Sequence, residues 1–290
     1  MITIGRFIHF AHRTLRTLRL LGVHLRLALP TNVSIKGPVA DGGLIVSLTS
    51  YPPRIRGCWV AIESIFRQSE LPDALVLTLC ETDFPGRKLP FSLRVQQSRG
   101  LTVLWVEQDG KSFDKLLPVR RLFPSASVIT IDDDVVLPAS FIAEMREAHR
   151  KSPRAIIGYR GWEIMPVDGT VLFGQGWRRA GAGSPSDRLF FAGNAGVLYP
   201  PGSLADQVFD IERAFAVSPS ADDIWFWACA VVNGTELRCL GKPAHMPVLF
   251  QRKTPALNTI NAAENGPQFD AAIKEFDLRE IIGRASGAGD

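Results

Sequence analysis

Short apolar runs alternate with stretches of helical periodicity between residues 44 and 131, and this alternation restricts the fold more than any other feature of the sequence. The apolar runs predict strands at 44–48, 74–79, 102–106 and 128–131. Residues 58–68 have the periodicity of a helix, and a second, short helix is expected near Leu116. Repeated strand–helix–strand units favour a mostly parallel sheet with helices on both faces, so we predict an α/β fold of the Rossmann type.

The composition is that of a folded globular protein. The chain of 290 residues is 46% hydrophobic and 21% charged, which excludes a mainly disordered chain and allows one large or two small domains. Its cysteines, Cys58, Cys80, Cys229 and Cys239, have neither a metal-binding nor a disulfide-dense spacing. We expect them to be reduced core residues rather than metal ligands or redox groups.

Positive charge is concentrated at the amino terminus. Of 33 basic and 29 acidic residues, residues 1–40 hold six basic ones and no acidic one, which leaves 27 basic against 29 acidic residues in the body. A general nucleic-acid surface needs a positive face on the folded domain. We therefore expect no nucleic-acid partner.

Residues 4–25 repeat apolar side chains at spacings of three and four, with the arginines largely off the apolar stripe. This pattern predicts a basic amphipathic helix, and residues 30–43 predict a linker. Such a helix lies on an anionic membrane or docks on its own domain or a partner, and the sequence leaves both readings open. No apolar run reaches the ~18 residues of a spanning helix, and a secretion signal is not recognisable. We expect a cytoplasmic protein, with residues 1–29 as the segment that would attach it peripherally to the inner face of the plasma membrane.

Asp132, Asp133 and Asp134 directly follow the fourth predicted strand. Three adjacent carboxylates repel one another at a strand end unless a cation or hydrogen-bond donors offset their charge. Mg²⁺ or Mn²⁺ would do so, and such an ion commonly completes its shell with water and substrate phosphates. The alternative is a solvated acidic turn that caps a helix starting near Ser140.

Four segments in order carry a resemblance to a known class: LIVSLTSYPPR at 44–54, VITIDDD at 128–134, GNAGVLYPP at 193–201 and SADDIW at 220–225. Together they resemble the successive signatures of bacterial glycosyltransferases of the GT-A type. The resemblance spans about residues 43–260 and leaves the amino-terminal segment outside. It implies a GT-A-like form of the predicted fold, with a leader at 1–40 and a catalytic domain at 41–290. Within that domain, residues 43–139 would form the donor half and 140–260 the acceptor half.

The resemblance implies a set of donor-binding residues. Thr49, Tyr51 and Arg54 would contact the nucleotide, and Arg54 suits phosphate because its guanidinium is a planar fork of donors. Lys115 would lie near the nucleotide, and Gly193 would let the backbone pass close to the donor sugar. Without the resemblance, the segment around Arg54 would be interpreted as a stiff surface loop and Lys115 as a solvated lysine. The segment that starts at Gly193 would be a strand with a turn.

The DxD motif of the class maps onto Asp132 and Asp134. Asp134 would be the direct metal ligand and Asp132 would lie near the ribose or the metal, while the role of Asp133 stays open. His245 would supply a third metal ligand, although a lone histidine beside Lys242 is more often structural.

Asp222 and Asp223 open a predicted helix at 224–232, where carboxylates also serve as caps. The class places a carboxylate here beside the acceptor hydroxyl, and we assign this catalytic role to Asp223, with Asp222 next to it. Asp223 would be a general base in an inverting mechanism or an electrostatic group in a retaining one. Trp225 and Trp227 follow, and they would stack on an acceptor sugar or pack in the core.

The expected function is metal-dependent transfer of a sugar from a nucleotide-diphosphate donor to a glycan or lipid-linked acceptor, in cell-surface polysaccharide synthesis. The cofactor would be Mn²⁺ or Mg²⁺. One alternative is a haloacid-dehalogenase-like phosphohydrolase, because residues 132–136 also satisfy the DxDx[TV] nucleophile pattern. In that class the nucleophile follows the first strand, whereas three strand-like segments precede the strand that leads to Asp132. The other alternative is a non-catalytic sugar- or membrane-binding protein.

Overall fold

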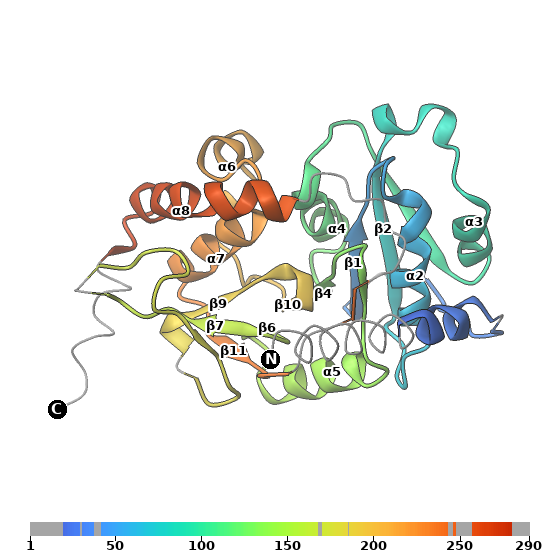
Figure 1. Ribbon diagram of the computed structural model, residues 1–290, viewed down its shortest axis with the longest axis horizontal. Coiled ribbons are helices and arrows are strands. Elements are labelled where there is room, and N and C mark those ends of the chain that lie inside the picture. The colour runs from blue at the N-terminus through green and yellow to red at the C-terminus, as the bar shows by residue number, and fades with distance from the viewer. Residues whose placement is uncertain are drawn as a thin grey trace, which may run out of the picture.

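A seven-stranded sheet forms the centre of the molecule in the computed structural model (Figure 1). The structure describes residues 20–29, 31–37, 42–167, 170–184, 186–242, 246–247 and 257–279. The strand order is β11-β6-β10-β4-β1-β2-β3. The strands are β1 (Leu44–Thr49), β2 (Ala74–Cys80), β3 (Leu101–Val106), β4 (Ser127–Thr130), β6 (Ile156–Gly158), β10 (Val197–Tyr199) and β11 (Leu237–Cys239). Only β10 runs against its neighbours β4 and β6, so the sheet is mostly parallel, as predicted.

The direction of the chain changes next to β1. After β1 the chain adds β2 and β3 on one side and then returns to place β4 on the other side. The carboxyl ends of β1 and β4 are therefore neighbours at a topological switch point, where open α/β sheets bind ligands. Because β10 is antiparallel, its amino end reaches the same edge.

Helices cover both faces of this sheet. They are α2 (Ile55–Phe66), α3 (Phe91–Gln97), α4 (Leu117–Leu122), α5 (Phe141–Lys151), α6 (Ile211–Val217), α7 (Asp222–Val232) and α8 (Leu257–Glu275), with short 3-10 helices at Glu81–Asp83, Pro85–Arg87, Lys111–Lys115, Ser186–Arg188, Gly193–Ala195 and Asp206–Phe209. Neighbouring side chains of a strand point to opposite faces. Ile45 of β1 accordingly packs in a core with residues of α4, α7 and α8, whereas Val46 packs in a second core with residues of α2, α3 and α5. The predicted α/β fold with helices on both faces is confirmed.

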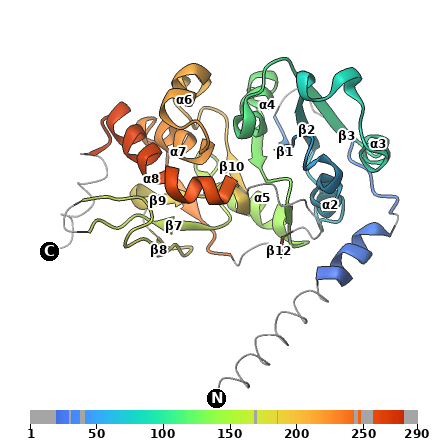
Figure 2. The same ribbon diagram turned by 45° about the horizontal axis from the view of Figure 1, so that its top comes forward.

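Two small antiparallel sheets flank the main one. The first joins β7 (Gly161–Glu163), β8 (Arg178–Arg179) and β9 (Leu189–Phe191), and the second pairs β5 (Val135–Val136) with β12 (Met246–Pro247). β7, β8 and β9 lie beside β10, α7 and α8 in Figures 1 and 2. They belong to residues 140–260, for which the acceptor half stays a prediction.

The described part of the amino-terminal segment packs on the body. Residues 20–28 are helical (Figure 2, blue), with Leu20 and Leu27 buried, and Arg67 of the body donates to the carbonyl of Leu29. Further along, the backbone N–H of Ile35 donates to the carbonyl of Arg99 over 2.8 Å. The rest of the predicted helix, residues 4–19, lies outside the described residues, and the division at residue 40 stays a prediction. Within the residues that the structure describes, no helix is both long and apolar enough to cross a membrane.

The predicted elements agree closely with those observed. The four predicted strands occur within one residue of their expected ends, whereas α2 begins three residues before the predicted helix at 58–68, because the turn after Tyr51 leads directly into it. All four cysteines are free and buried, as expected for reduced core residues.

Candidate active site

The loop after β1 and the acidic residues after β4 meet at the carboxyl edge of the sheet. Nη2 of Arg54 lies 2.5 Å from Oδ1 of Asp133 and 2.6 Å from Oδ2 of Asp134, and the Ser50 hydroxyl donates to Oδ2 of Asp133 over 2.6 Å. Burial disfavours the charge of Arg54, but the neighbouring carboxylates outweigh it and raise the pKa of Arg54. Arg54 therefore stays cationic and holds the loop after β1 against the acidic strand end.

The three adjacent aspartates have different surroundings. Asp133 is buried, and burial raises its pKa to about 7, although Arg54 and Ser50 favour the ionised form. The side chains of Asp132 and Asp134 are instead 33% and 43% exposed. Asp133, whose role the sequence left open, thus faces inward, and the other two remain accessible to a ligand.

Lys115 joins this strand end to the second acidic pair. It ends the 3-10 helix Lys111–Lys115, and its buried ammonium lies 2.9 Å from Asp222 Oδ2, 3.3 Å from Asp132 Oδ1 and 4.0 Å from Asp223 Oδ1. Burial alone would lower the pKa of Lys115, but the three carboxylates raise it well above its ordinary value. Lys115 is therefore a fixed positive charge between the two acidic clusters.

Asp222 and Asp223 are the first two residues of α7. The N-cap is Ala221, whose side chain makes no capping bond, and the backbone N–H of Gly193 donates to Oδ2 of Asp223 over 2.9 Å. Burial raises the pKa of both carboxyls, and the Asp222 charge raises that of Asp223 further. Asp222 is bound in the Lys115 ion pair with a side chain only 7% exposed, while that of Asp223 is 26% exposed.

The backbone at Gly193 lies against this pair. A Cβ at position 193 would lie 2.7 Å from Asp223 Oδ1 and 2.8 Å from Lys115 Nζ, closer than real Cβ contacts. Gly193 is therefore required by close approach, and it belongs to the same cluster as the acids.

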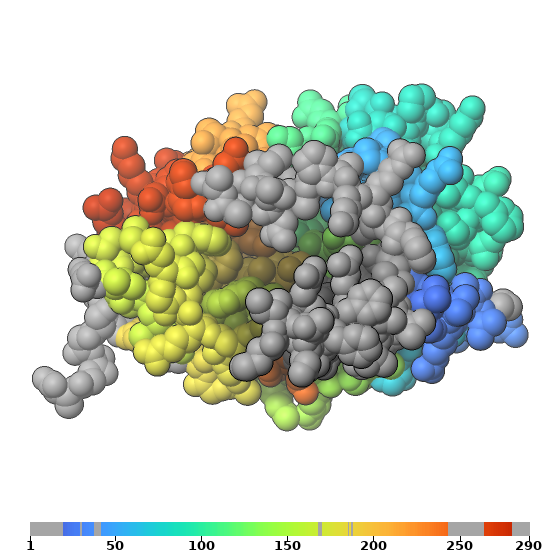
Figure 3. All heavy atoms as spheres, in the orientation of Figure 1, coloured from blue at the N-terminus to red at the C-terminus, as the bar shows by residue number. Residues whose placement is uncertain are grey.

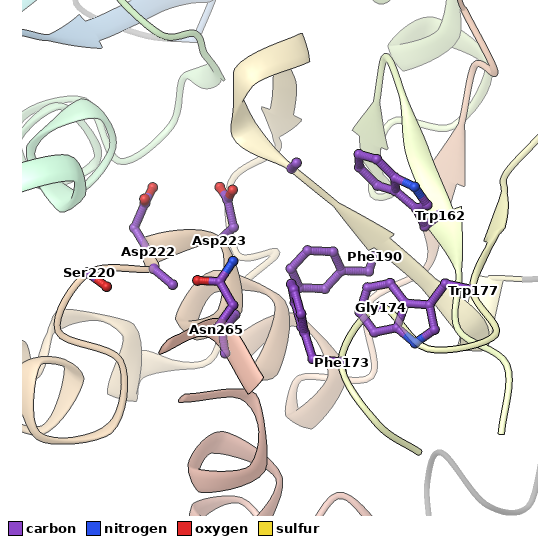
Figure 4. A pocket seen from close by; sticks show the side chains of 12 residues that line it. Trp162, Phe173, Gly174, Trp177, Phe190, Ser220, Asp222, Asp223 and Asn265 are labelled. Atoms are coloured by element: carbon purple, nitrogen blue, oxygen red, sulfur yellow. The ribbon is translucent and has the colours of Figure 1, made fainter. Parts of the chain in front are cut away.

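A cavity of about 300 Å³ opens beside Asp222 and Asp223. Figure 4 shows Asp222, Asp223 and Asn265 on one side of it, Trp162 and Trp177 on the other, and Phe173 and Phe190 between them. In Figure 3 the surface is hollowed to the right of the yellow-green segment around β7 and β8. The aromatic residues that line the cavity are Trp162, Phe173, Trp177 and Phe190.

The sequence did not single out these aromatic residues. It pointed instead to Trp225 and Trp227, but both are buried, and their indole N–H groups donate to the carbonyls of Val208 and Leu189 over 3.2 and 3.0 Å. Trp225 and Trp227 pack in the core, so neither is available to stack on a ligand. β7 and β8 have three and two residues, too few for a periodic pattern to reveal which side chains face a cavity.

The donor set fits part of a divalent metal site. Asp132 and Asp134 offer hard oxygen ligands that are open to solvent, and Mg²⁺ or Mn²⁺ is commonly held by one or two carboxylates together with water and phosphate oxygens. Over the described ranges, no group of three His, Cys, Asp or Glu side chains is arranged to hold a metal. His245, the predicted third ligand, lies outside the described residues.

Most of the predicted site residues come together. Arg54, Lys115, Asp132, Asp134, Asp222, Asp223 and Gly193 form one connected cluster at the carboxyl edge. Thr49 ends β1 next to the cluster, but its hydroxyl donates to the carbonyl of Thr78 in the neighbouring strand over 3.0 Å. Tyr51 is half-buried in the loop that leads to Arg54.

The chain matches no protein-family model and no curated protein. Among solved structures it is similar to TarS 1–349 from S. aureus in complex with UDP-GlcNAc, with a TM-score of 0.51 and 10% identity over 81% of this chain and 66% of that one. The mannosyltransferase PcManGT from Pyrobaculum calidifontis, in complex with GDP-Man and Mn²⁺, matches with a TM-score of 0.48 and 14% identity over 99% of this chain and 87% of that one. The match spans less than two thirds of the TarS fragment. At such identities the likeness to TarS shows a common fold, and the predicted GT-A-like form of the α/β fold is confirmed.

Proposed function

We propose that the chain is a glycosyltransferase that moves a sugar from a nucleotide-diphosphate donor to a hydroxyl of a glycan or lipid-linked acceptor, in cell-surface polysaccharide synthesis. The observation that carries the proposal is the position of Lys115, which contacts Asp132 on the donor side and Asp222 on the cavity side. A donor placed along the carboxyl edge would therefore have its reacting end at the mouth of the cavity. The TarS structure with its sugar nucleotide has the same fold, which supports this donor class.

The leaving diphosphate needs positive charge, and the site supplies it from two directions. Arg54 lies at the accessible carboxylate of Asp134 and Lys115 at that of Asp132, so both cations border the place where a diphosphate would lie. A divalent ion on Asp132 and Asp134 would add Lewis-acid stabilisation of the departing phosphate oxygens. Fixed charges at a leaving group lower the barrier because they need no reorganisation during the reaction.

Asp223 is the residue we assign to the acceptor hydroxyl. It lines the cavity, is more exposed than Asp222, and is held in place by the Gly193 N–H. A buried carboxylate with a raised pKa is a stronger base than an exposed one. In this arrangement Asp222 keeps Lys115 in position, and Asp223 receives or orients the hydroxyl proton.

The test is a screen of the purified chain against several nucleotide sugars, with and without Mn²⁺, that reads thermal shift and released nucleotide. We expect metal-dependent release of a nucleoside diphosphate. Asp134→Asn should abolish the metal-dependent turnover, and Asp223→Asn should keep donor binding but lose transfer. Asp206→Asn, which alters an exposed carboxylate of another 3-10 helix, is the control and should behave as wild type.

Other outcomes would contradict the proposal. Release of inorganic phosphate together with a trapped aspartyl-phosphate would indicate the phosphohydrolase. Sugar binding without turnover of any donor would indicate a non-catalytic binding protein, and near-normal turnover of Asp134→Asn would refute the metal assignment.

A peripheral membrane location belongs to the same proposal. In the described part of the amino-terminal segment, Leu21 and Leu25 of the helix and Leu29 directly after it are exposed at a spacing of four. Leu27 packs on Val60 and Val136 of the body. An apolar stripe beside a basic segment suits an anionic bilayer. Residues 1–29 would thus bring the site to a membrane-bound acceptor on the inner face of the plasma membrane.

A further inference from the structure

The wall of the cavity opposite Asp223 is an aromatic surface with a rigid support. Trp162 of β7 and Phe190 of β9 are register partners in the small sheet, so their side chains lie on the same face. Trp177 packs against Phe190 and against Phe269 of α8, with ring centroids 5.2 and 5.5 Å apart. The half-buried ring of Trp177 is therefore fixed by packing, and Trp162 and Trp177 both line the cavity.

Two polar atoms of the lining lack partners. Oδ1 of Asn265 and Nε1 of Trp177 are buried and find no hydrogen-bond partner among the described residues. A buried polar atom without a partner is costly, so these two atoms favour a ligand or water that both donates and accepts hydrogen bonds. A sugar ring does so, and it also has apolar faces that stack on aromatic side chains.

Two arginines lie next to Trp162, which lines the cavity. The Arg160 guanidinium carbon is 5.0 Å from the centroid of the Trp162 ring, and Arg179 is the register partner of Trp162 on β8. Burial and the charge of Arg179 lower the pKa of Arg160, so the two guanidinium groups repel each other. In the described part of the chain neither arginine forms an ion pair, and Nε of Arg160 is buried without a hydrogen-bond partner.

Adjacent cations that repel each other are stabilised by an anion between them. Guanidinium groups bind carboxylate and phosphate groups with two parallel hydrogen bonds. Asp222 and Asp223 thus form an acidic side of the cavity, and Trp162 and Trp177 form its aromatic wall. Arg160 and Arg179 add positive charge next to Trp162.

We propose that this cavity binds the acceptor as a saccharide that carries an anionic group. Its ring packs against Trp162 and Trp177, its carboxylate or phosphate binds Arg160 and Arg179, and its reacting hydroxyl faces Asp223. The inference rests on the proposed function and adds the chemical class of the acceptor. In the reaction, the hydroxyl oxygen forms the new bond to the anomeric carbon, the bond from that carbon to the phosphate oxygen breaks, the electron pair leaves with the nucleoside diphosphate, and the hydroxyl proton passes to Asp223.

The first test measures ligand binding without any donor. Methyl β-D-glucuronide, D-glucose 6-phosphate and the neutral methyl β-D-glucoside are titrated against the full chain, and saturation-transfer NMR gives the dissociation constants. We expect at least one anionic saccharide to bind ten or more times more tightly than the neutral one, and the two anions show whether a carboxylate or a phosphate is preferred. Arg160→Gln or Arg179→Gln should remove this preference, and Trp162→Leu should weaken all three saccharides.

The matched control is Arg178→Gln. Arg178 precedes Arg179 on the same strand and is equally exposed, but neighbouring side chains of a strand point to opposite faces. This variant should keep the preference for the anion. Equal binding of all three saccharides, or a preference that survives both Arg160→Gln and Arg179→Gln, would overturn the proposal.

A second measurement separates this inference from the proposed function. Slow hydrolysis of the nucleotide sugar by the wild type, with transfer to water, tests the donor site alone and should be unchanged in Arg178→Gln. Donor hydrolysis without saccharide selectivity would refute only the acceptor class. Selective saccharide binding without any donor binding would instead refute the glycosyltransferase.

Discussion

The ammonium nitrogen of Lys115 lies 2.9 Å from Oδ2 of Asp222, and both side chains are buried. The two residues come from a 3-10 helix before α4 and from the start of α7. Their contact joins the two segments of the chain that carry the acidic motifs. A buried ion pair of this kind fixes geometry, because each charge is costly without the other.

Lys115→Met should lower the free energy of unfolding by about 3–5 kcal/mol, because it leaves the Asp222 carboxylate buried without its cation. Urea denaturation checks the value. The double variant Lys115→Met/Asp222→Asn should recover part of the loss, since the uncompensated charge is then gone. Lys88→Met, at an exposed lysine, is the control and should stay within about 0.5 kcal/mol of wild type. A single variant as stable as wild type would show that the ion pair does not fix the site.

Removal of Asp133 should cost more stability than removal of Asp134, although the two residues are adjacent. Asp133→Ala takes a buried partner from Ser50 and from Arg54, and it should cost about 1–3 kcal/mol of stability. Asp134→Ala removes a half-exposed partner of Arg54 and should cost about 1 kcal/mol or less. Urea denaturation of both variants compares them directly. Equal losses would contradict the inward position of Asp133.

The sequence predicts the strands and the place of the acidic residues, but it does not predict which side chains turn inward or line the cavity. The apolar runs identify the strands and place the acidic triplet at the edge of the sheet, because a strand buried on both faces is rich in Val, Ile and Leu along its length. The apolar runs do not identify which aspartate turns inward. In an extended chain the side chain of Asp133 points away from those of Asp132 and Asp134, but either side could be the buried one. The aromatic wall was missed for another reason: Trp162 and Trp177 owe their position to the pairing of β7, β8 and β9, and that pairing leaves no local pattern.

Gly193→Ala should impair turnover more than folding. The added Cβ would push against Asp223 and Lys115, so both side chains must shift from their present positions. A displacement of about 1 Å at reacting groups can cost about 100-fold in rate, and we expect kcat/KM to fall at least tenfold. Gly183→Ala is the matched control, because a Cβ there meets nothing within 4 Å. The prediction fails if steady-state kinetics with the donor identified in the screen give equal values for both variants.

Asp114 should make the fold less stable as the pH rises. Burial raises its pKa from 3.8 to about 7, although the Gly110 N–H, which donates to Oδ2 over 3.0 Å, favours the ionised form. Between these two values the folded chain binds a proton that the unfolded chain has released, so stability falls from about pH 4 to pH 7 and then levels off. The cost at pH 8 is at most about 4 kcal/mol, since tenfold in a protonation constant is about 1.4 kcal/mol.

Asp114→Asn removes this titration and keeps an acceptor for Gly110. Its free energy of unfolding should exceed that of wild type at pH 8, and the difference should shrink toward pH 4. Asp83→Asn, at an exposed carboxylate of the 3-10 helix Glu81–Asp83, should leave the pH dependence unchanged. Parallel curves for wild type and Asp114→Asn across this range would show that Asp114 is not the titrating group.

The exposed leucines of the amino-terminal helix should govern association with anionic vesicles. Leu25 is 61% exposed and Leu29 is 63% exposed, while Leu27 between them packs on the body, so a double change to glutamate alters the outer stripe without touching the packed side. Burying apolar surface at the bilayer and attracting basic residues both favour binding, and two glutamates oppose each effect. We expect co-sedimentation with phosphatidylglycerol vesicles to fall at least tenfold in Leu25→Glu/Leu29→Glu, with nucleotide release in solution unchanged.

Leu122→Glu changes a comparably exposed leucine, 57% exposed, at the end of α4 and should bind vesicles as wild type does. Equal co-sedimentation of the double variant and wild type would mean that the outer stripe serves another partner.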